Sequence, residues 1–433
     1  MSDQSVPSGW RTGCISDIAT VNPSVSVSSL DDCCDVSFLT MADVGKNGRI
    51  LNHQVRQLHQ VRVGFTRFEE GDILFAKITP CMEHGKGAFA KNLVNRYGFG
   101  STEFHVLRAN EQGIAEFIYH VAQWNDVRTK AIAFFTGSAG QQRVDTTFFS
   151  RFSLLIPTLP EQRKIAKILT TVDNLIEKTE ALIAKYQSVK QGLMHDLFTR
   201  GVDEHGHLRP PYADAPDLYK ESELGWIPRE WDAEPLEKVS SSLITYGIVQ
   251  PGPHIPDGIP FVQTKDLTGG FLKKSQMDRT SPEIADSYKR SAIQAGDIVC
   301  GIRATVGVIV EIPFDLNGAN ISRGVARISP KTSHNSRYVL WVMRSRQVQD
   351  ALQREVKGTT YAEVTLPALR RIPIPIPKRT EQDHIVRAIQ ASEARIDTEK
   401  NALSKYRIIK TALMQDLLTG KVRVKVDAET ANV

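Results

Sequence analysis

The chain repeats itself, and this internal duplication constrains the fold more than any other feature of its sequence. When the 433-residue sequence is displaced by 220 positions, eight of the fifteen residues from 185 to 199 are identical to residues 405 to 419. Shorter motifs recur in the same order: Glu161-Gln162 with Glu381-Gln382, Ile156-Pro157 with Ile376-Pro377, Pro7-x-x-Trp10 with Pro228-x-x-Trp231, and Gly71-Asp72-Ile73 with Gly296-Asp297-Ile298. The sequence therefore predicts a tandem duplication of one unit of roughly 200 residues.

The first part of each unit has the pattern of a mixed α/β domain. Short apolar runs between glycine-containing turns predict strands, which lie at Asp72–Ala76, Phe104–Leu107 and Ile298–Cys300. Helices are predicted at Ala115–Trp124 and Tyr338–Arg344. Each unit then leaves its domain through a proline-containing segment, Leu154–Pro157 or Ile372–Pro377. Because proline excludes helix and central-strand pairing, these two segments are predicted to be extended connectors.

A long amphipathic helix is predicted after each connector. In Glu161–Thr199, apolar residues alternate at spacings of three and four and form a heptad stripe, made of Ile165, Ile168, Val172, Leu175, Thr179, Leu182, Tyr186, Val189 and Leu193. The second stripe, in Glu381–Thr419, is interrupted by Ser392, Arg395 and Glu399. Two pictures remain open. The helices pair with one another as a coiled coil, which the length of the stripe favours, or each lies on its own domain.

The predicted organisation follows from these patterns. Residues 201–227 are polar, proline-rich and without a hydrophobic period, so they are predicted to be a linker. We expect the following parts: a first domain at 1–158, a long helix at 159–200, the linker at 201–227, a second domain at 228–378, a second long helix at 379–420, and a tail at 421–433.

The amino-acid composition excludes few classes of protein. The excess of 54 Lys and Arg over 49 Asp and Glu permits a polyanionic partner without requiring one. The five cysteines form no C-x-x-C spacing, which indicates free thiols in the cytoplasm. No apolar run approaches the ~18–20 residues that cross a bilayer, so no membrane partner is expected.

The sequence predicts no catalytic site, cofactor or metal. Pro210-Pro-Tyr212 resembles part of an adenine methyltransferase motif, but Arg209 precedes it where that chemistry needs an acceptor side chain. Gly85-Lys-Gly87 lacks the remaining residues of a nucleotide phosphate loop. His205 and His207 have no second ligand pair near them in the sequence. We therefore expect a non-catalytic protein.

Taken in order, the repeated motifs resemble the specificity subunit of Type I restriction-modification enzymes. The resemblance rests on P-x-x-W, then G-D-I, then the loop from Thr136 to Arg143, then Ile-Pro with Glu-Gln, and a long helix that ends in Leu-Met-x-Asp-Leu. It implies two target recognition domains separated by two helices that pair antiparallel. It also implies binding to double-stranded DNA, to two methyltransferase subunits and to restriction or motor subunits.

Candidate DNA contacts are polar residues in glycine-flanked segments, because base edges and phosphates accept hydrogen bonds from such side chains. In the first unit these are Lys77, Lys86, Lys91, Thr136, Ser138, Gln141 and Arg143. In the second they are Lys265, Lys273, Lys274, Arg303, Thr359, Thr360 and Tyr361. For each, the alternative is an ordinary solvated surface residue.

Four repeated charges on the helices are candidate docking residues. Lys190 and Asp196 recur as Lys410 and Asp416, and they are predicted to stay on exposed faces when the apolar stripes pair. We expect two equivalent docking surfaces there, one for each methyltransferase subunit. The alternative is a pair of ordinary solvated faces left by the duplication.

Two functions compete at this point. In the first, the chain is a DNA-binding subunit that reads a bipartite, asymmetric target with one half-sequence per domain. In the second, it is a coiled-coil adaptor whose α/β domains bind proteins or small ligands. The absence of a recognisable active site from a duplicated domain favours the first.

Overall fold

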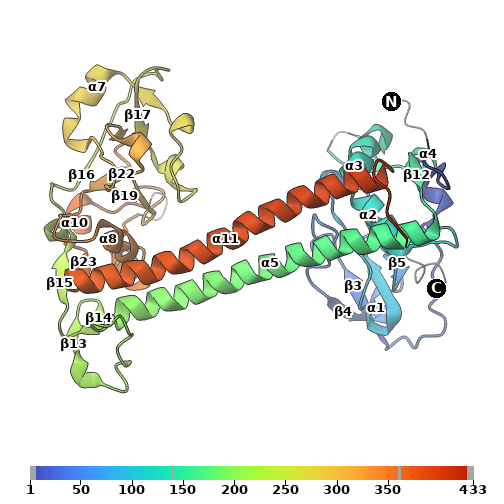
Figure 1. Cartoon of the computed structure of the whole chain (residues 1–433), viewed down its shortest axis with the longest axis horizontal. Helices are drawn as coiled ribbons and strands as arrows, with labels where there is room; N and C mark the ends of the chain where they lie inside the picture. The colour runs from blue at the N-terminus through green and yellow to red at the C-terminus, as the bar shows by residue number, and fades with distance from the viewer. Residues whose placement is uncertain (1–5, 139, 359–361, 427–433) are drawn as a thin grey trace. The chain divides into compact units, whose positions relative to one another are not determined.

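The structure, a computed structural model, describes residues 6–138, 140–358 and 362–426 (Figure 1). The chain divides into two compact units. Unit 1 comprises Met1–Ala181 and Lys400–Val433, and unit 2 comprises Leu182–Glu399. Each unit therefore contains one predicted domain together with part of both long helices. None of the helices within the described ranges has the length and apolar character needed to cross a membrane.

Unit 1 contains two four-stranded sheets. Sheet one has the order β2-β9-β6-β7 and is antiparallel, whereas sheet two has the order β4-β3-β8-β5 with a parallel β3/β8 pair. The strands are β1 Arg11–Cys14, β2 Ala19–Val21, β3 Asp35–Leu39, β4 Gln54–Gln57, β5 Thr66–Glu69, β6 Ile73–Ala76, β7 Gly87–Phe89, β8 Tyr97–Gly100, β9 Phe104–Ala109, β10 Phe135–Thr136, β11 Arg143–Val144 and β12 Ser153–Ile156. The short helices are α1 Leu58–Val61, α2 Ala115–Gln123, α3 Asn125–Ala131 and α4 Thr147–Arg151.

Unit 2 repeats this plan with small changes. Its antiparallel sheet has the order β16-β22-β19-β20, and its second sheet has the order β18-β17-β21 with a parallel β17/β21 pair. The strands are β13 Tyr219–Ser222, β14 Gly225–Pro228, β15 Asp232–Pro235, β16 Thr245–Tyr246, β17 Ile259–Val262, β18 Arg279–Thr280, β19 Ile298–Gly301, β20 Ile309–Glu311, β21 Asn320–Ile321, β22 Val325–Ile328 and β23 Pro373–Ile376. The short helices are α6 Leu236–Val239, α7 Pro282–Ser287, α8 Ser336–Met343, α9 Arg346–Arg354 and α10 Leu366–Arg371.

The strand orders confirm the duplication and the predicted mixed α/β class. In both units an inner strand, β6 or β19, begins at the isoleucine of the Gly-Asp-Ile motif. It pairs with β9 or β22 in the same register, Ile73 opposite Leu107 and Ile298 opposite Ile328. The Gly-Asp-Ile motif is structural, because Asp72 and Asp297 each accept a hydrogen bond from the backbone three residues earlier, at 2.7 and 2.9 Å.

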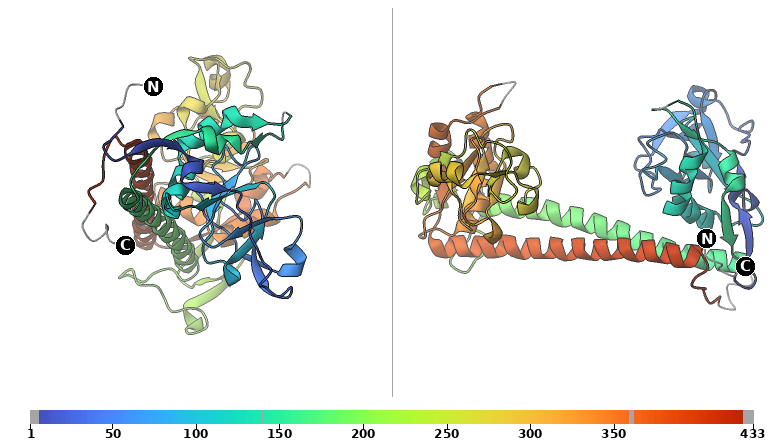
Figure 2. Two further views of the ribbon diagram at one scale, coloured as in Figure 1. Left: turned by 90° about the vertical axis from the view of Figure 1, so that its right-hand side faces the viewer. Right: turned by 90° about the horizontal axis from the view of Figure 1, so that it is seen from above.

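The two long helices form as predicted, as α5 Leu159–Thr199 and α11 Arg379–Leu418 (Figures 1 and 2). In unit 1 the first part of α5 lies beside the last part of α11, where Asp173 pairs with Lys410 at 2.6 Å. In unit 2 the last part of α5 lies beside the first part of α11, where Lys190 pairs with Glu393 at 2.9 Å. Within each unit the two helices are therefore antiparallel.

The predicted stripe of α5 is wrong by one residue at several positions. Leu175 and Val189 are 41% and 55% exposed, and the buried stripe through the first part of the helix consists of Ile165, Leu169, Val172, Ile176, Thr179 and Ile183. The helix carries apolar doublets at 168–169, 175–176 and 182–183. Because spacings of three and four both satisfy a heptad, either member of a doublet could have been the buried one.

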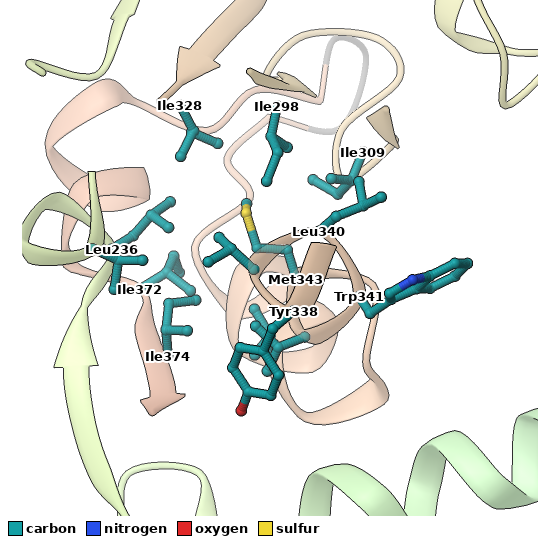
Figure 3. Packing of buried hydrophobic residues seen from close by; sticks show 14 of the residues in the cluster. Leu236, Ile298, Ile309, Ile328, Tyr338, Leu340, Trp341, Met343, Ile372 and Ile374 are labelled. Atoms are coloured by element: carbon teal, nitrogen blue, oxygen red, sulfur yellow. The ribbon is translucent and has the colours of Figure 1, made fainter. Parts of the chain in front are cut away.

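The two long helices also pack into the cores of the units. Each helix therefore both pairs with the other long helix and lies on a domain. In unit 2 a single cluster contains the sheet residues Ile298 and Ile328 and Tyr338 of α8 (Figure 3). The same cluster includes Phe198 of α5 and Ile385 of α11. In unit 1 the equivalent cluster joins β6 and α2 to Leu169 and Met414. The pairing of α5 with α11 and the packing of both on a domain are thus one continuous core in each unit.

Residues 201–227 are more structured than the linker that their composition predicts. Strands β13 and β14 form a hairpin, and Tyr219, Leu224 and Ile227 are buried. The proline-containing connectors are extended as predicted, and each forms a two-stranded pair, β12 with β1 and β23 with β15. Pro373 and Pro375 alternate along β23, so their missing N–H groups share one edge and leave the other edge to pair.

Candidate nucleic-acid interface

Most of the candidate DNA contacts of unit 1 gather where three backbone segments meet at the end of β6. The segment after β6 is hydrogen-bonded to the turn before β9, from Lys77 N to Glu103 O at 2.9 Å. It is also bonded to β11, from Val144 N to Lys77 O at 2.9 Å and from Thr79 N to Gln142 O at 2.9 Å. We call residues 77–79, 103 and 142–144 the junction of unit 1.

Unit 2 builds the same junction from the equivalent segments. Ile302 N donates to Gly324 O at 2.9 Å, Val364 N to Ile302 O at 3.0 Å, and Ala304 N to Ala362 O at 3.1 Å. Residues 302–304, 324 and 362–364 are the junction of unit 2. Each of the three backbone hydrogen bonds has its counterpart in unit 1, so the two junctions correspond residue by residue.

Each junction holds an arginine and a glutamate in a close ion pair. Arg143 donates from Nε to Glu103 Oε2 at 2.9 Å and from Nη2 to Oε1 at 2.8 Å. Hydrogen bonds from Arg143 hold the pKa of Glu103 below its ordinary value, so the glutamate stays ionised. In unit 2, Arg303 donates from Nε and Nη2 to Glu363 Oε1 at 2.9 and 2.7 Å. The arginine side chains are 41% and 40% exposed.

The remaining candidates of this region surround the junctions. Thr136, Ser138 and Gln141 are exposed on the hairpin of β10 and β11, whose strand Arg143–Val144 belongs to the junction. Lys77 is half-buried at the start of its segment. Thr359, Thr360 and Tyr361 lie outside the described residues, between Lys357 and Glu363, which form a β-bridge with each other.

Other candidate lysines lie outside the junctions and have partners of their own. Lys86 donates to Met41 O at 2.6 Å, and Lys274 donates to Asp315 O at 2.8 Å. Lys265 pairs with Asp278 at 2.6 Å, and its hydrogen bond lowers the pKa of that carboxyl group. Lys91 and Lys273 lie over aromatic rings, those of Phe89 and Phe271.

The prediction that Lys190 and Lys410 stay on exposed faces is wrong. Their side chains are only 18% and 17% exposed, because each pairs with an acid of the opposite long helix. Lys190 also lies over the ring of Trp341, 4.2 Å from its centre. The repeated lysine therefore has a structural reason, since it joins α5 to α11 once in each unit. Asp196 and Asp416 are partly exposed and pair with Arg200 and Lys421 nearby in the chain.

The repeated Glu-Gln motif attaches each long helix to its domain. Buried Glu161 accepts hydrogen bonds from Trp10 Nε1 at 2.9 Å and from Arg423 at 2.7 Å. Buried Gln162 accepts from Ile114 N at 3.0 Å, and Gln382 accepts from Asn335 N at 2.8 Å. These motif residues are thus accounted for by the fold and are not part of the candidate interface.

Solved structures share this fold. One, described as showing complex assembly and conformational transition of the type I R-M system, aligns with a TM-score of 0.60 at 18% identity and covers 97% of this chain and 100% of its own. The S subunit of a Type I restriction-modification system from M. genitalium aligns with a TM-score of 0.54 at 14% identity, covering 96% and 98% of the two chains.

Sequence comparison identifies the family. The model described as Type I restriction modification DNA specificity domain matches residues 7–186 and 255–405. The MjaVIII specificity subunit of a type I restriction enzyme from Methanocaldococcus jannaschii is 26% identical over 301 residues, which cover 67% of each chain. The chain belongs to the Type I restriction-modification specificity family. It is a DNA sequence-specificity subunit without catalytic activity of its own, and the adaptor alternative is not favoured.

Sequence reasoning missed the two glutamates of the junctions. Glu103 and Glu363 occupy different places in the repeat, because Glu103 corresponds to Gly324 and Glu363 corresponds to Arg143 in the backbone pairing. Comparison of the repeats therefore gave no signal for either residue.

Proposed function

We propose that the chain reads a bipartite, asymmetric DNA target, with one half-sequence read at each junction. The observation that carries this proposal is that both units build the same backbone junction and place different side chains on it. An equivalent framework positions both surfaces in the same way, whereas different side chains present different hydrogen-bonding groups to the bases. Two similar but unequal half-sequences follow.

The two halves are separated by an unread gap. The long helices contain 41 and 40 residues without interruption, and continuous helices are stiff on this scale. A gap of fixed length is therefore expected between the half-sequences. In this proposal phosphates or base edges are contacted by half-buried Lys77 of the unit 1 junction and by the exposed residues beside it, Thr136, Ser138 and Gln141.

The test is to map the methylated adenines in a genome, by single-molecule sequencing, with and without this chain in the cell. The expected result is a motif present only with the chain and made of two different short sequences around a fixed gap. A contiguous motif or a perfectly palindromic one would contradict the proposal. Filter binding across salt concentrations adds a second readout, because neutralised phosphates make DNA affinity fall steeply with salt.

In the same proposal the chain assembles with two methyltransferase subunits and with restriction subunits. The relatives are named as subunits of type I restriction enzymes, which supports such an assembly. Because Lys190 and Lys410 are engaged between the helices, the docking faces must use other residues. Val189 and Ile409 occupy equivalent positions in the repeats and are 55% and 46% exposed, so both repeats present an apolar residue to solvent at the same place on the helix.

Mass measurement of the reconstituted complex tests this assembly. The wild-type chain should hold two methyltransferase subunits, and V189R should hold one, because an arginine at a buried apolar contact is poorly tolerated. Lys185→Arg, a substitution on the same helix that keeps the charge, serves as the control. A wild-type complex with a single methyltransferase, or a V189R complex with two, would contradict the proposed docking.

A further inference from the structure

The arginine–glutamate pairs of the junctions are built differently in the two units. In unit 1 the arginine comes from the third segment, at position 143, and the glutamate from the second, at position 103. In unit 2 the arginine comes from the first segment, at position 303, and the glutamate from the third, at position 363. The bridge that joins Ile78 to Arg143 in unit 1 joins Arg303 to Glu363 in unit 2.

Because the arginine and the glutamate occupy different positions in the two units, the duplication alone does not explain why both junctions contain such a pair. Charges inherited from a duplication are expected at equivalent positions, as Lys190 and Lys410 are. Here the equivalent positions hold different residues, and yet the same chemical pair occurs at the same place in the fold. The pair itself therefore requires a physical reason at that place.

The geometry of the pair matches the recognition of a guanine. In both units the carboxylate occupies the Nε–Nη2 edge of the guanidinium group, so the Nη1–Nη2 end is directed away from the glutamate. In unit 1 one N–H of Nη1 also donates to Gln141 O at 3.3 Å, and the second N–H of Nη1 remains for a ligand at that end. That end carries two parallel N–H donors, which fit the N7 and O6 acceptors of guanine in the major groove. Both arginines remain about two-fifths exposed, so a ligand can reach them.

The charge of the pair favours a base over a phosphate. A paired glutamate neutralises most of the field of the arginine, and that field is what attracts a phosphate at long range. The directional hydrogen bonds remain, and the carboxylate fixes the plane of the guanidinium group. A neutral, oriented fork is suited to reading a base edge.

We propose that Arg143 and Arg303 each read one guanine, one in each half of the target, and that Glu103 and Glu363 orient them. This inference rests on the proposed function, because it assumes that each junction faces DNA. It makes the arginines specificity-determining residues and the glutamates positioning residues.

The experiment is selection of bound duplexes from a randomised DNA library by the full chain together with a type I methyltransferase subunit. R143Q is expected to lower the preference for guanine about 10- to 100-fold at one position of one half-sequence, because a bidentate contact contributes discrimination of this size. All other positions should keep their preferences. R303Q should act in the same way on the other half-sequence only.

Controls keep the result interpretable. R11Q removes an arginine from another exposed ion pair of unit 1, that with Asp17, and should leave the motif unchanged. The unaltered half-sequence reports in each variant that the chain is folded. E103Q keeps an acceptor for Arg143 and should weaken the same guanine as R143Q, to a smaller degree, which a purely stabilising ion pair would not do.

The outcomes separate the two proposals. A wild-type chain that selects no sequence would overturn the proposed function itself. A wild-type chain that selects a bipartite motif, with R143Q and R303Q leaving every position unchanged or weakening all positions equally, would overturn the guanine assignment alone. If R143Q does not fold, R303Q and E103Q decide by the same criteria.

Discussion

Arg128 is a buried cation that supports the loop after β6. Its side chain donates to the carbonyls of Ala122 at 2.7 Å and Lys86 at 3.3 Å, and it lies 3.8 Å from the centre of the Phe75 ring. Burial lowers the pKa of Arg128 to about 9. A buried guanidinium group is retained at a cost, so its hydrogen bonds to the loop must compensate for its desolvation.

Replacement of Arg128 by methionine should destabilise unit 1 by about 2–4 kcal/mol, because carbonyls that lose their donors stay buried. Chemical denaturation of the full chain measures this change. The exposed Arg151 provides the control, since R151M should change stability by less than about 0.5 kcal/mol. Equal effects of the two substitutions would contradict the role assigned to Arg128.

His120 should make the fold sensitive to acid. The histidine is buried between α2 and α5, and its Nε2 is hydrogen-bonded to Thr170 Oγ1 at 3.0 Å. Burial lowers the pKa of His120 to about 3. The unfolded chain binds a proton at this residue near pH 6.5, whereas the folded chain does not until about pH 3. The stability contributed by His120 is therefore complete above pH 6.5 and is lost as the pH falls.

Between pH 7.5 and pH 5 the wild-type chain should lose about 2 kcal/mol more unfolding free energy than H120Q, which cannot take up that proton. Denaturant titrations at both pH values test this difference. Parallel pH dependences of the two proteins would show that His120 is not buried in its neutral form.

At the scale of elements, a partly buried ion pair joins α5 to α11 in each unit. Lys410 and Asp173 are each less than one-fifth exposed and approach to 2.6 Å, so removing one partner leaves the other charge partly buried. K410A should destabilise unit 1 by about 2 kcal/mol, given that the site retains some solvent. The double variant D173K/K410D should recover part of that loss, which a double-mutant cycle measures. No recovery would mean that the pair does not act through its charges.

The same elements mark what the sequence could predict. The limits of α5 and α11 were predictable to within about two residues because no proline lies in Glu161–Thr199 or Glu381–Thr419 and the apolar period is long. The buried stripe of α5 was not predictable, because either member of a doublet such as Leu175-Ile176 satisfies a heptad spacing of three or four. The hairpin of β13 and β14 was not predicted because the composition of residues 201–227 is polar and rich in proline. Three buried residues of this segment, Tyr219, Leu224 and Ile227, form no hydrophobic period.

In the candidate site the two arginines were predictable from the sequence, but their glutamate partners were not. Arg143 and Arg303 were found as basic residues beside glycine-containing turns, which is a local pattern. Their partners Glu103 and Glu363 are 40 and 60 residues away in the chain. Only the strand pairing of each unit brings these residues together, and no local pattern contains that information.

At the scale of the whole molecule, the duplication predicts that the gap and the half-sequences are set by different parts of the chain. Insertion of one heptad at facing positions of both α5 and α11 should lengthen the gap, because it adds about 10 Å of helix while the apolar period is kept. The two half-sequences should not change. Motif mapping would contradict this division if the insertion altered the bases that are read.

The most direct test of the central claim, that each unit reads its own half-sequence, is an exchange of one domain. Residues 1–150 are replaced by the equivalent part of a relative with a different target, and methylated adenines are mapped by single-molecule sequencing. One half-sequence should change to that of the relative while the other half is retained. A change in both halves together, or in neither, would show that the two units do not read separate half-sequences.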